Sequence, residues 1–290
     1  MNSKNPWHGW LLVAPALILL IAFTHYPALA TLWHSFQSNA TQLRPARFVG
    51  LDNYQGMIED PVFWASLVNN AWFAIATVPL SIALAIVMAL FVNARLPGKG
   101  FLRLAYFTPT VLPMIAVANI WLFFYTPQYG LIAQLLAPLG IASPNWLGDK
   151  DLALGAMIVV AIWKEAGFFM IFYLAALQQV SPSLAEAAAL EGASRWQYFW
   201  RVLFPLLMPT TIFVLVNALI NAVRMVDHII VMTRGGPDNA SSLLLYYIYQ
   251  VGFSFWDGAY AAALTVVVLV ILGTIALVKF TYLDKRAHYQ

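Results

Sequence analysis

Six apolar stretches follow one another along the 290-residue chain, separated by polar intervals. Each has the ~20 residues that a helix needs to cross the hydrocarbon of a bilayer. Only helices and closed barrels satisfy their backbone polar groups in lipid, and apolar runs this long indicate helices. The sequence therefore predicts an all-α integral membrane protein with one transmembrane domain over residues 1–290. The predicted spans are about 10–33, 67–93, 104–125, 152–178, 204–232 and 259–281.

The distribution of charge supports this prediction and orients the chain. Only 9% of the residues are charged, against about 25% in soluble proteins. Basic residues gather in the intervals 94–103 and 179–203 and after the last span, and the other intervals carry the acidic excess. Cytoplasmic loops carry the excess of Lys and Arg. We therefore expect both termini and the loop at about 181–205 in the cytoplasm, and no nucleic-acid partner.

Prolines stand within or at the ends of three predicted spans, where they free backbone carbonyls and bend the helix axis. Bent helices suit a protein that lines a cavity, and they are also frequent in plain membrane bundles. The residues concerned are Pro79, Pro109, Pro113, Pro205 and Pro209.

No catalytic constellation is present in the sequence. It contains no phosphate-binding G-x-x-x-x-G-K-[ST] loop, no H-E-x-x-H, no G-x-S-x-G and no cysteine. We therefore expect a protein without a catalytic residue, a metal or a cofactor. If it moves a solute uphill, the energy must come from an ion gradient or from a separate ATPase.

Four polar residues of the fifth predicted span fall on one narrow face of a continuous helix at about 100° per residue. Polar groups are costly in lipid, so the stripe either lines a solute path or faces a partner helix that satisfies it by hydrogen bonds. Asp227 lies off this face and could form an ion pair with Arg224. The stripe consists of Asn217, Asn221, Arg224 and His228.

Two adjacent charged residues, Lys164 and Glu165, stand near the middle of the fourth predicted span. Charge at this depth is costly and is usually functional. We therefore add both residues, together with Asp227, to the predicted substrate path.

The polar interval before the fifth span carries a helix former, a glycine and then a basic and aromatic run, which predicts helix-turn-helix. The full string from Glu186 to Pro209 reads EAAALEGASRWQYFWRVLFPLLMP. It resembles the EAA loop of the permease subunits of ATP-driven, binding-protein-dependent importers. The string FVGLDNY at 48–54 and the segments Trp163-Lys164 and 232–237 resemble further parts of the maltose-type and glycerol-phosphate-type permeases.

This resemblance implies the six-helix core of the type I importer permease fold in a bacterial inner membrane. The expected partners are a second permease, a dimer of ATP-binding subunits and an extracytoplasmic solute-binding protein. The helix after Glu186 would be the coupling helix that seats in a groove of the ATPase. Gly192 would form its turn, because glycine adopts a positive φ without a Cβ clash. The implied coupling residues are Glu186, Ala187, Ala188, Leu190 and Gly192.

The solute class depends on Arg224. Many sugar permeases carry an apolar or aromatic residue at this place, whereas a guanidinium binds phosphate, sulfonate or carboxylate with two hydrogen bonds. Arg224 therefore favours an anionic solute unless Asp227 neutralises it. The alternative function is an ion-coupled secondary transporter or channel without an ATPase. That alternative predicts inverted repeats and discontinuous helices with paired carboxylates near mid-depth, and only Glu165 and Asp227 are available as the carboxylates.

Overall fold

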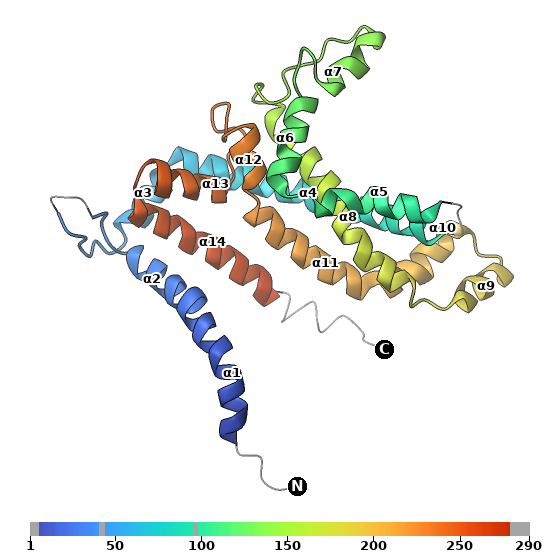
Figure 1. Cartoon of the computed structure of the whole chain (residues 1–290), viewed down its shortest axis with the longest axis horizontal. Helices are drawn as coiled ribbons and strands as arrows, with labels where there is room; N and C mark the ends of the chain where they lie inside the picture. The colour runs from blue at the N-terminus through green and yellow to red at the C-terminus, as the bar shows by residue number, and fades with distance from the viewer. Residues whose placement is uncertain (1–5, 41–43, 95–97, 279–290) are drawn as a thin grey trace. The chain divides into compact units, whose positions relative to one another are not determined.

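Helices make up most of the computed structural model, which describes residues 6–40, 44–94 and 98–278 (Figure 1). These residues contain no strand, and their one isolated β-bridge joins Gln37 to Phe48. The all-α prediction is therefore confirmed. The end of the sixth predicted span at 279–281 and several of the basic residues used to orient the chain lie outside the described residues. Those basic residues are Arg95, Lys279, Lys285 and Arg286.

The chain divides into two compact units, of which the first comprises Met1–Pro61 and Ile248–Val270. Its N-terminal helix continues through a π-helical turn that ends two residues before Pro27. Proline has no N–H for the preceding turn, and a π turn accommodates this loss without ending the helix. The helices of this unit are α1 (Pro6–Leu20), η1 (Ile21–His25), α2 (Tyr26–His34), α3 (Asp52–Glu59), η4 (Gln250–Ser254) and most of α14 (Gly258–Val278).

The second unit comprises Val62–Tyr247 and Ile271–Gln290. Within it, α5 and α11 both pack against α8, whereas α6 packs against α12 (Figure 1). The helices are α4 (Pro61–Asn93), α5 (Lys99–Val111), α6 (Met114–Phe124), α7 (Leu131–Leu136), η2 (Ala137–Leu139), α8 (Ala153–Leu177), α9 (Pro182–Leu190), α10 (Arg195–Tyr198), η3 (Phe199–Leu203), α11 (Phe204–Arg224), α12 (Asp227–Met232) and most of α13 (Leu244–Tyr249).

Each of the six predicted apolar stretches corresponds to helix in the structure. Five described stretches are long and apolar enough to cross a membrane: Gly9–His34, Pro61–Asn93, Ala153–Leu177, Arg195–Met232 and Gly258–Val278. The third predicted span is different, because it is a pair of helices, α5 and α6, bent by 104°. Pro113 directly precedes α6, so the bend expected at this proline is confirmed, whereas Pro79 and Pro209 lie inside the continuous helices α4 and α11. The helix also begins earlier than predicted, at Lys99.

The fifth span is not one continuous helix, and this part of the prediction is wrong. Helix α11 ends at Arg224, and Met225 takes an extended backbone with ψ 120° before α12 begins at Asp227. No proline or glycine marks this break in the sequence. The helical spacing used for the polar stripe therefore holds through Arg224 and does not extend to His228.

Helix α8 contributes many of the most deeply buried residues of the second unit, among them Phe169, Met170 and Tyr173. Its crossing with α5 is unusually close at Gly167. A Cβ built there would lie 2.2 Å from the backbone oxygen of Tyr106 and 3.2 Å from Thr110 Oγ1. Small residues let membrane helices approach each other in this way. Gly167 therefore fixes how near α5 lies to α8.

We expect Gly167→Ala to destabilise the protein by about 1–3 kcal/mol, because the added methyl group overpacks a contact made by backbone. The matched control is Gly155→Ala in the same helix, where an added Cβ meets no atom within 4 Å. This control should unfold at the native midpoint or above it, because alanine is more favourable than glycine in a helix interior. Thermal unfolding of the two purified variants makes the comparison, and equal midpoints would contradict the close crossing.

Candidate functional site

The break between α5 and α6 is held by a lysine from α8. Lys164 Nζ donates to the backbone oxygens of Pro109, at 3.0 Å, and of Leu112, at 2.6 Å. Pro113 has no N–H, so it cannot donate to the carbonyl of Pro109 as a helical residue would. The ammonium therefore supplies donors that the interrupted helix lacks. Lys164, which the sequence predicts to line the substrate path, therefore directs its charge at backbone carbonyls.

The neighbouring Glu165 is half-buried and accepts a hydrogen bond of 2.9 Å from Asn221 Nδ2. Both side chains line a small cavity, together with Phe73, Thr77, Ser81 and residues of α11. The structure therefore joins two of the predicted path residues, one from the fourth span and one from the fifth. Asn221 therefore satisfies one oxygen of a half-buried carboxyl group, which would be costly to leave without a partner.

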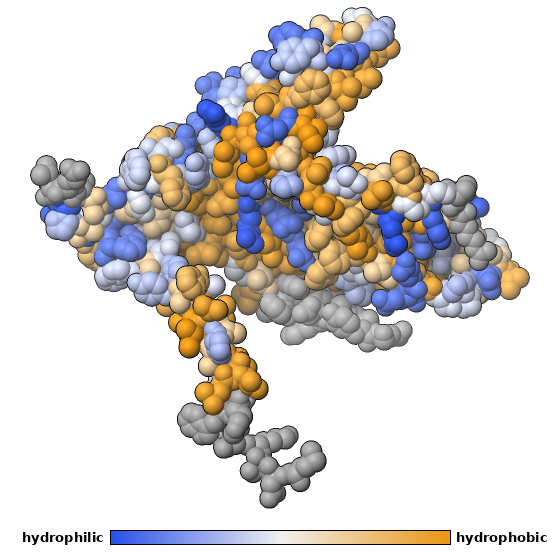
Figure 2. Space-filling model, in the orientation of Figure 1, coloured by the Kyte–Doolittle hydropathy of each residue, from blue (hydrophilic) through white to orange (hydrophobic). Residues whose placement is uncertain are grey.

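The remaining polar residues of α11 differ in their environments. Asn217 is partly exposed and donates to the oxygen of Phe213, one turn earlier in its own helix. Arg224 and Asp227 are exposed on either side of the break. Figure 2 shows hydrophilic side chains gathered over the end of α11 in a face that is largely hydrophobic. The accessible polar groups of this span therefore concentrate at the break.

Arg224 and Asp227 do not neutralise each other. The structure gives no hydrogen bond or ion pair to either side chain within the described part of the chain. The two non-helical residues between them, Met225 and Val226, interrupt the helical spacing that would bring the two side chains together. The guanidinium therefore remains available to an anion from outside the chain.

His228 lies elsewhere than the sequence suggested. Its side chain is 0% exposed and its ring packs on Phe73, with the ring centroids 5.8 Å apart. Neither ring nitrogen has a hydrogen-bond partner among the described residues. The stripe of four polar residues is therefore wrong for this member, because the break before α12 directs His228 into the core.

The coupling-loop region forms the helix-turn-helix that the sequence predicts. Helix α9 ends at Leu190, and Gly192 follows with φ +75°. The N–H of Ala193 donates to the oxygen of Ala188, which closes the turn. Ser194 then begins α10 with a capping box, in which its hydroxyl and the side chain of Gln197 each accept the other residue's backbone N–H. No atom lies within 4 Å of a Cβ added at Gly192, so its backbone conformation alone favours glycine.

The side chains of this region are directed outward. Leu190 is 91% exposed, and Glu186, Ala187 and Glu191 are exposed as well, whereas Ala188 is half-buried. An isolated leucine with this exposure contributes nothing to the stability of its own chain. The region therefore presents an exposed apolar side chain between two exposed acidic residues.

A polar network at the start of α4 has a structural role. Ser66 donates to Ser242, Asn69 to the oxygens of Asn239 and Ser242, and Asn70 to the oxygen of Ala222. Asn70 also accepts from the N–H of Leu244. These side chains hold the segment 239–244 in place, and no local pattern around residues 66–70 could identify partners about 170 residues away.

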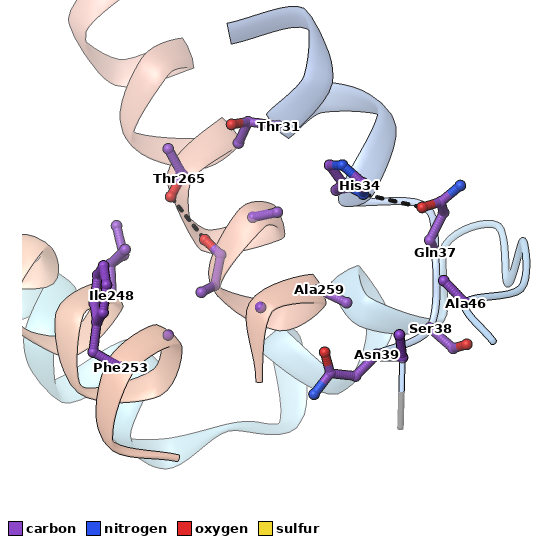
Figure 3. A pocket seen from close by; sticks show the side chains of 15 residues that line it. Thr31, His34, Gln37, Ser38, Asn39, Ala46, Ile248, Phe253, Ala259 and Thr265 are labelled. Carbon is purple, nitrogen blue, oxygen red and sulfur yellow. Dashed lines mark hydrogen bonds between the residues drawn. The ribbon is translucent and has the colours of Figure 1, made fainter. Parts of the chain in front are cut away.

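A cavity of about 500 Å³ lies in the first unit between α2 and α14 (Figure 3). Its polar side includes His34, which bonds to Gln37 at 3.0 Å, and its other side is formed by Ala259, Ala262 and Thr265. The residues that line it carry no formal charge apart from the titratable His34. The cavity therefore offers no guanidinium or ammonium group to an anion, unlike the break at Arg224.

Comparison with known proteins identifies relatives along nearly the whole chain. The trehalose/maltose transport system permease protein of Thermococcus litoralis is 35% identical over 93% of this chain and 92% of its own. The sulfoquinovosyl glycerol transport system permease protein of Agrobacterium fabrum is 34% identical over 89% and 84%. The sn-glycerol-3-phosphate transport system permease protein of Escherichia coli O157:H7 is 31% identical over the full length of both.

Solved structures share the fold. A chain of a bacterial ABC transporter involved in the import of the acidic polysaccharide alginate superposes with a TM-score of 0.84, at 24% identity over 98% of this chain and 96% of that one. The family model described as binding-protein-dependent transport system inner membrane component matches residues 56–289. This chain therefore belongs to that family of multi-pass inner-membrane permeases.

Proposed function

We propose that this chain is the permease subunit of an ATP-driven importer for a sugar, a polyol or a glycerol-phosphate-like solute. It forms the solute path together with a second permease and catalyses no reaction itself, since a partner subunit hydrolyses the ATP. Family membership supports this function over an ion-coupled transporter or channel acting alone.

The observation that carries the proposal is the projecting region from α9 to α10. This region presents a short helix, a turn at Gly192 and the exposed apolar side chain of Leu190. A groove on another protein would bind such a helix through its apolar side chain. Helices that dock in grooves present apolar anchors at helical spacing, and the flanking Glu186 and Glu191 would meet basic residues there. We propose that Glu186, Ala187, Ala188, Leu190 and Gly192 couple the chain to a dimer of ATP-binding subunits.

The proposed substrate path runs along the accessible polar groups of α11 and its break. Asn217, Arg224 and Asp227 are at least partly exposed, and Asn221 reaches Glu165 deeper in the bundle. The sequence pattern also places Lys164 and His228 in the path. In the structure their polar atoms face backbone carbonyls and the core, so we propose that they support the path from behind.

Arg224 supports an anionic group on the solute, because its guanidinium has no partner within the described chain and binds phosphate, sulfonate or carboxylate through two hydrogen bonds. One relative is a permease for sn-glycerol-3-phosphate, which bears a phosphate, and another for trehalose and maltose, which bear no charge. All of these solutes are rich in hydroxyl groups. We propose an anionic solute of this hydroxyl-rich kind, delivered by an extracytoplasmic solute-binding protein.

Coupling is tested by Glu186→Lys in the assembled importer. We expect normal insertion and assembly but at least about tenfold less uptake per ATP hydrolysed, because reversing a charge in an interface places like charges together. The matched control is Glu59→Lys, an equally exposed change in α3. Uptake and ATP hydrolysis are measured in proteoliposomes, and full coupling in Glu186→Lys would sink the assignment of this helix.

The solute path is tested by Arg224→Leu. Uptake of the cognate anionic solute should fall at least about tenfold, since a desolvated anion loses a charge-assisted pair of hydrogen bonds. Arg224→Lys should retain part of the uptake, and Arg103→Leu, an exposed cation in α5, should retain nearly all of it. Membrane levels of the three variants serve as the reference. Undiminished uptake by Arg224→Leu would exclude a contact between this residue and an anionic group.

Orientation is tested by reporter fusions. We propose that both termini and the coupling region lie in the cytoplasm. Fusions after residues 40, 140 and 245 should then report an external location, and fusions after residues 99, 195 and 290 an internal one, following the excess of basic residues. A single clear inversion would show that the proposed orientation is wrong.

A further inference from the structure

Two spans of the second unit break in the same way. Between α5 and α6 the gap is Leu112 and Pro113, and between α11 and α12 it is Met225 and Val226. The first residue of each gap is extended, with ψ 135° at Leu112 and 120° at Met225. The halves before the gaps, α5 and α11, both pack on α8, and the halves after them, α6 and α12, pack on each other. We call these four gap residues the joint.

Helix α8 contacts both broken spans with two consecutive residues. The side chains of successive helix residues point about 100° apart and therefore contact different neighbouring helices. Lys164 is directed at the first gap, where its ammonium donates to Pro109 and Leu112. Glu165 is directed at α11, where it accepts from Asn221, one turn before the second gap. One uninterrupted helix is thus attached to both broken ones.

The attachment to α5 has a fixed register. Gly167 stands one turn after Lys164 in α8 and touches the backbone of α5 at Tyr106, one turn before Pro109. A sliding of α8 along α5 would remove this close contact and both hydrogen bonds of the ammonium together. The contacts at Gly167 and Lys164 therefore define a single relative position of the two helices.

We propose that Lys164 and Glu165 are positioning residues that attach the two broken spans to α8, and we call this pair of attachments the clasp. The helices after the gaps, α6 and α12, then rotate together. This inference rests on the proposed transport function and deepens it, since it states what Lys164 does in place of contacting the solute. Two of the three ammonium donors already serve backbone oxygens. Lys164 supplies donors to the first broken span, Glu165 accepts from α11, and the accessible Arg224 remains available to the solute.

The clasp is tested by distances between spin labels in the assembled importer in lipid nanodiscs, without solute or ATP. The chain has no cysteine, so pairs can be introduced cleanly. Cysteines at Leu104 and Ile120 bracket the first gap, and cysteines at Leu206 and Val231 bracket the second. A pair at Trp72 and Val87 lies within the uninterrupted α4 and reports the general condition of the protein.

We expect Lys164→Met to raise the population of an opened joint about tenfold, which corresponds to the loss of a charge-assisted hydrogen bond. The rise should occur in both bracketing pairs, because α6 and α12 pack together. Glu165→Ala should have the same effect through the other attachment. Lys164→Arg, which keeps the donors, and Lys150→Met, which removes an exposed cation, should keep the native distances, and the α4 pair should never change.

Native distances in both bracketing pairs of Lys164→Met and Glu165→Ala would overturn the clasp. A change confined to the nearer gap would overturn the shared joint. If one variant fails to reach the membrane, the other provides the same comparison. Since no solute is present, these distances are independent of whether the importer moves the solute proposed above, and a failure of uptake alone would bear only on that proposal.

Discussion

A helix that breaks inside a membrane must find new partners for the backbone groups that it frees, and this requirement organises the second unit. Lipid offers no hydrogen bonds, and each unsatisfied group costs several kcal/mol. The gap at Leu112 and Pro113 is therefore possible only where another helix brings donors, which Lys164 does. That lysine in turn reaches the gap only because Gly167 lets α8 approach α5 so closely. The break at Pro113 thus depends on Lys164, and the position of Lys164 depends on Gly167.

Features that depend on neighbours in sequence could be predicted. The six apolar stretches follow from span length alone, and the turn at Gly192 follows from a helix former, a glycine and then a basic and aromatic run. Pro113 predicted a bend, because a proline lacks the N–H that a helix needs and is recognised directly in the sequence. The angle of 104° could not be predicted, since it depends on how α6 packs against α12.

Features that depend on distant residues could not be predicted. Lys164 looked like a group for a solute, because the carbonyls that it serves lie more than 50 positions away and carry no mark in the sequence. The four-residue stripe failed at His228 for a related reason. Neither Met225 nor Val226 is a proline or a glycine, the two residue types that most strongly mark the end of a helix, so the break is not visible in the sequence. Helical spacing was a sound guide as far as Arg224, where the helix itself ends.

The length of α4 gives membrane thickness a role in this protein. Its 33 residues extend about 50 Å at ~1.5 Å per residue, whereas the hydrocarbon of a bilayer is ~30 Å thick. A helix with such hydrophobic mismatch tilts, and it tilts further in a thinner bilayer. Ser66 and Asn69 fasten the segment 239–244 to the beginning of this helix. The segment 239–244 must tilt with the helix. The lipid composition of the membrane therefore sets the orientation of this loop, although the loop itself need not touch lipid.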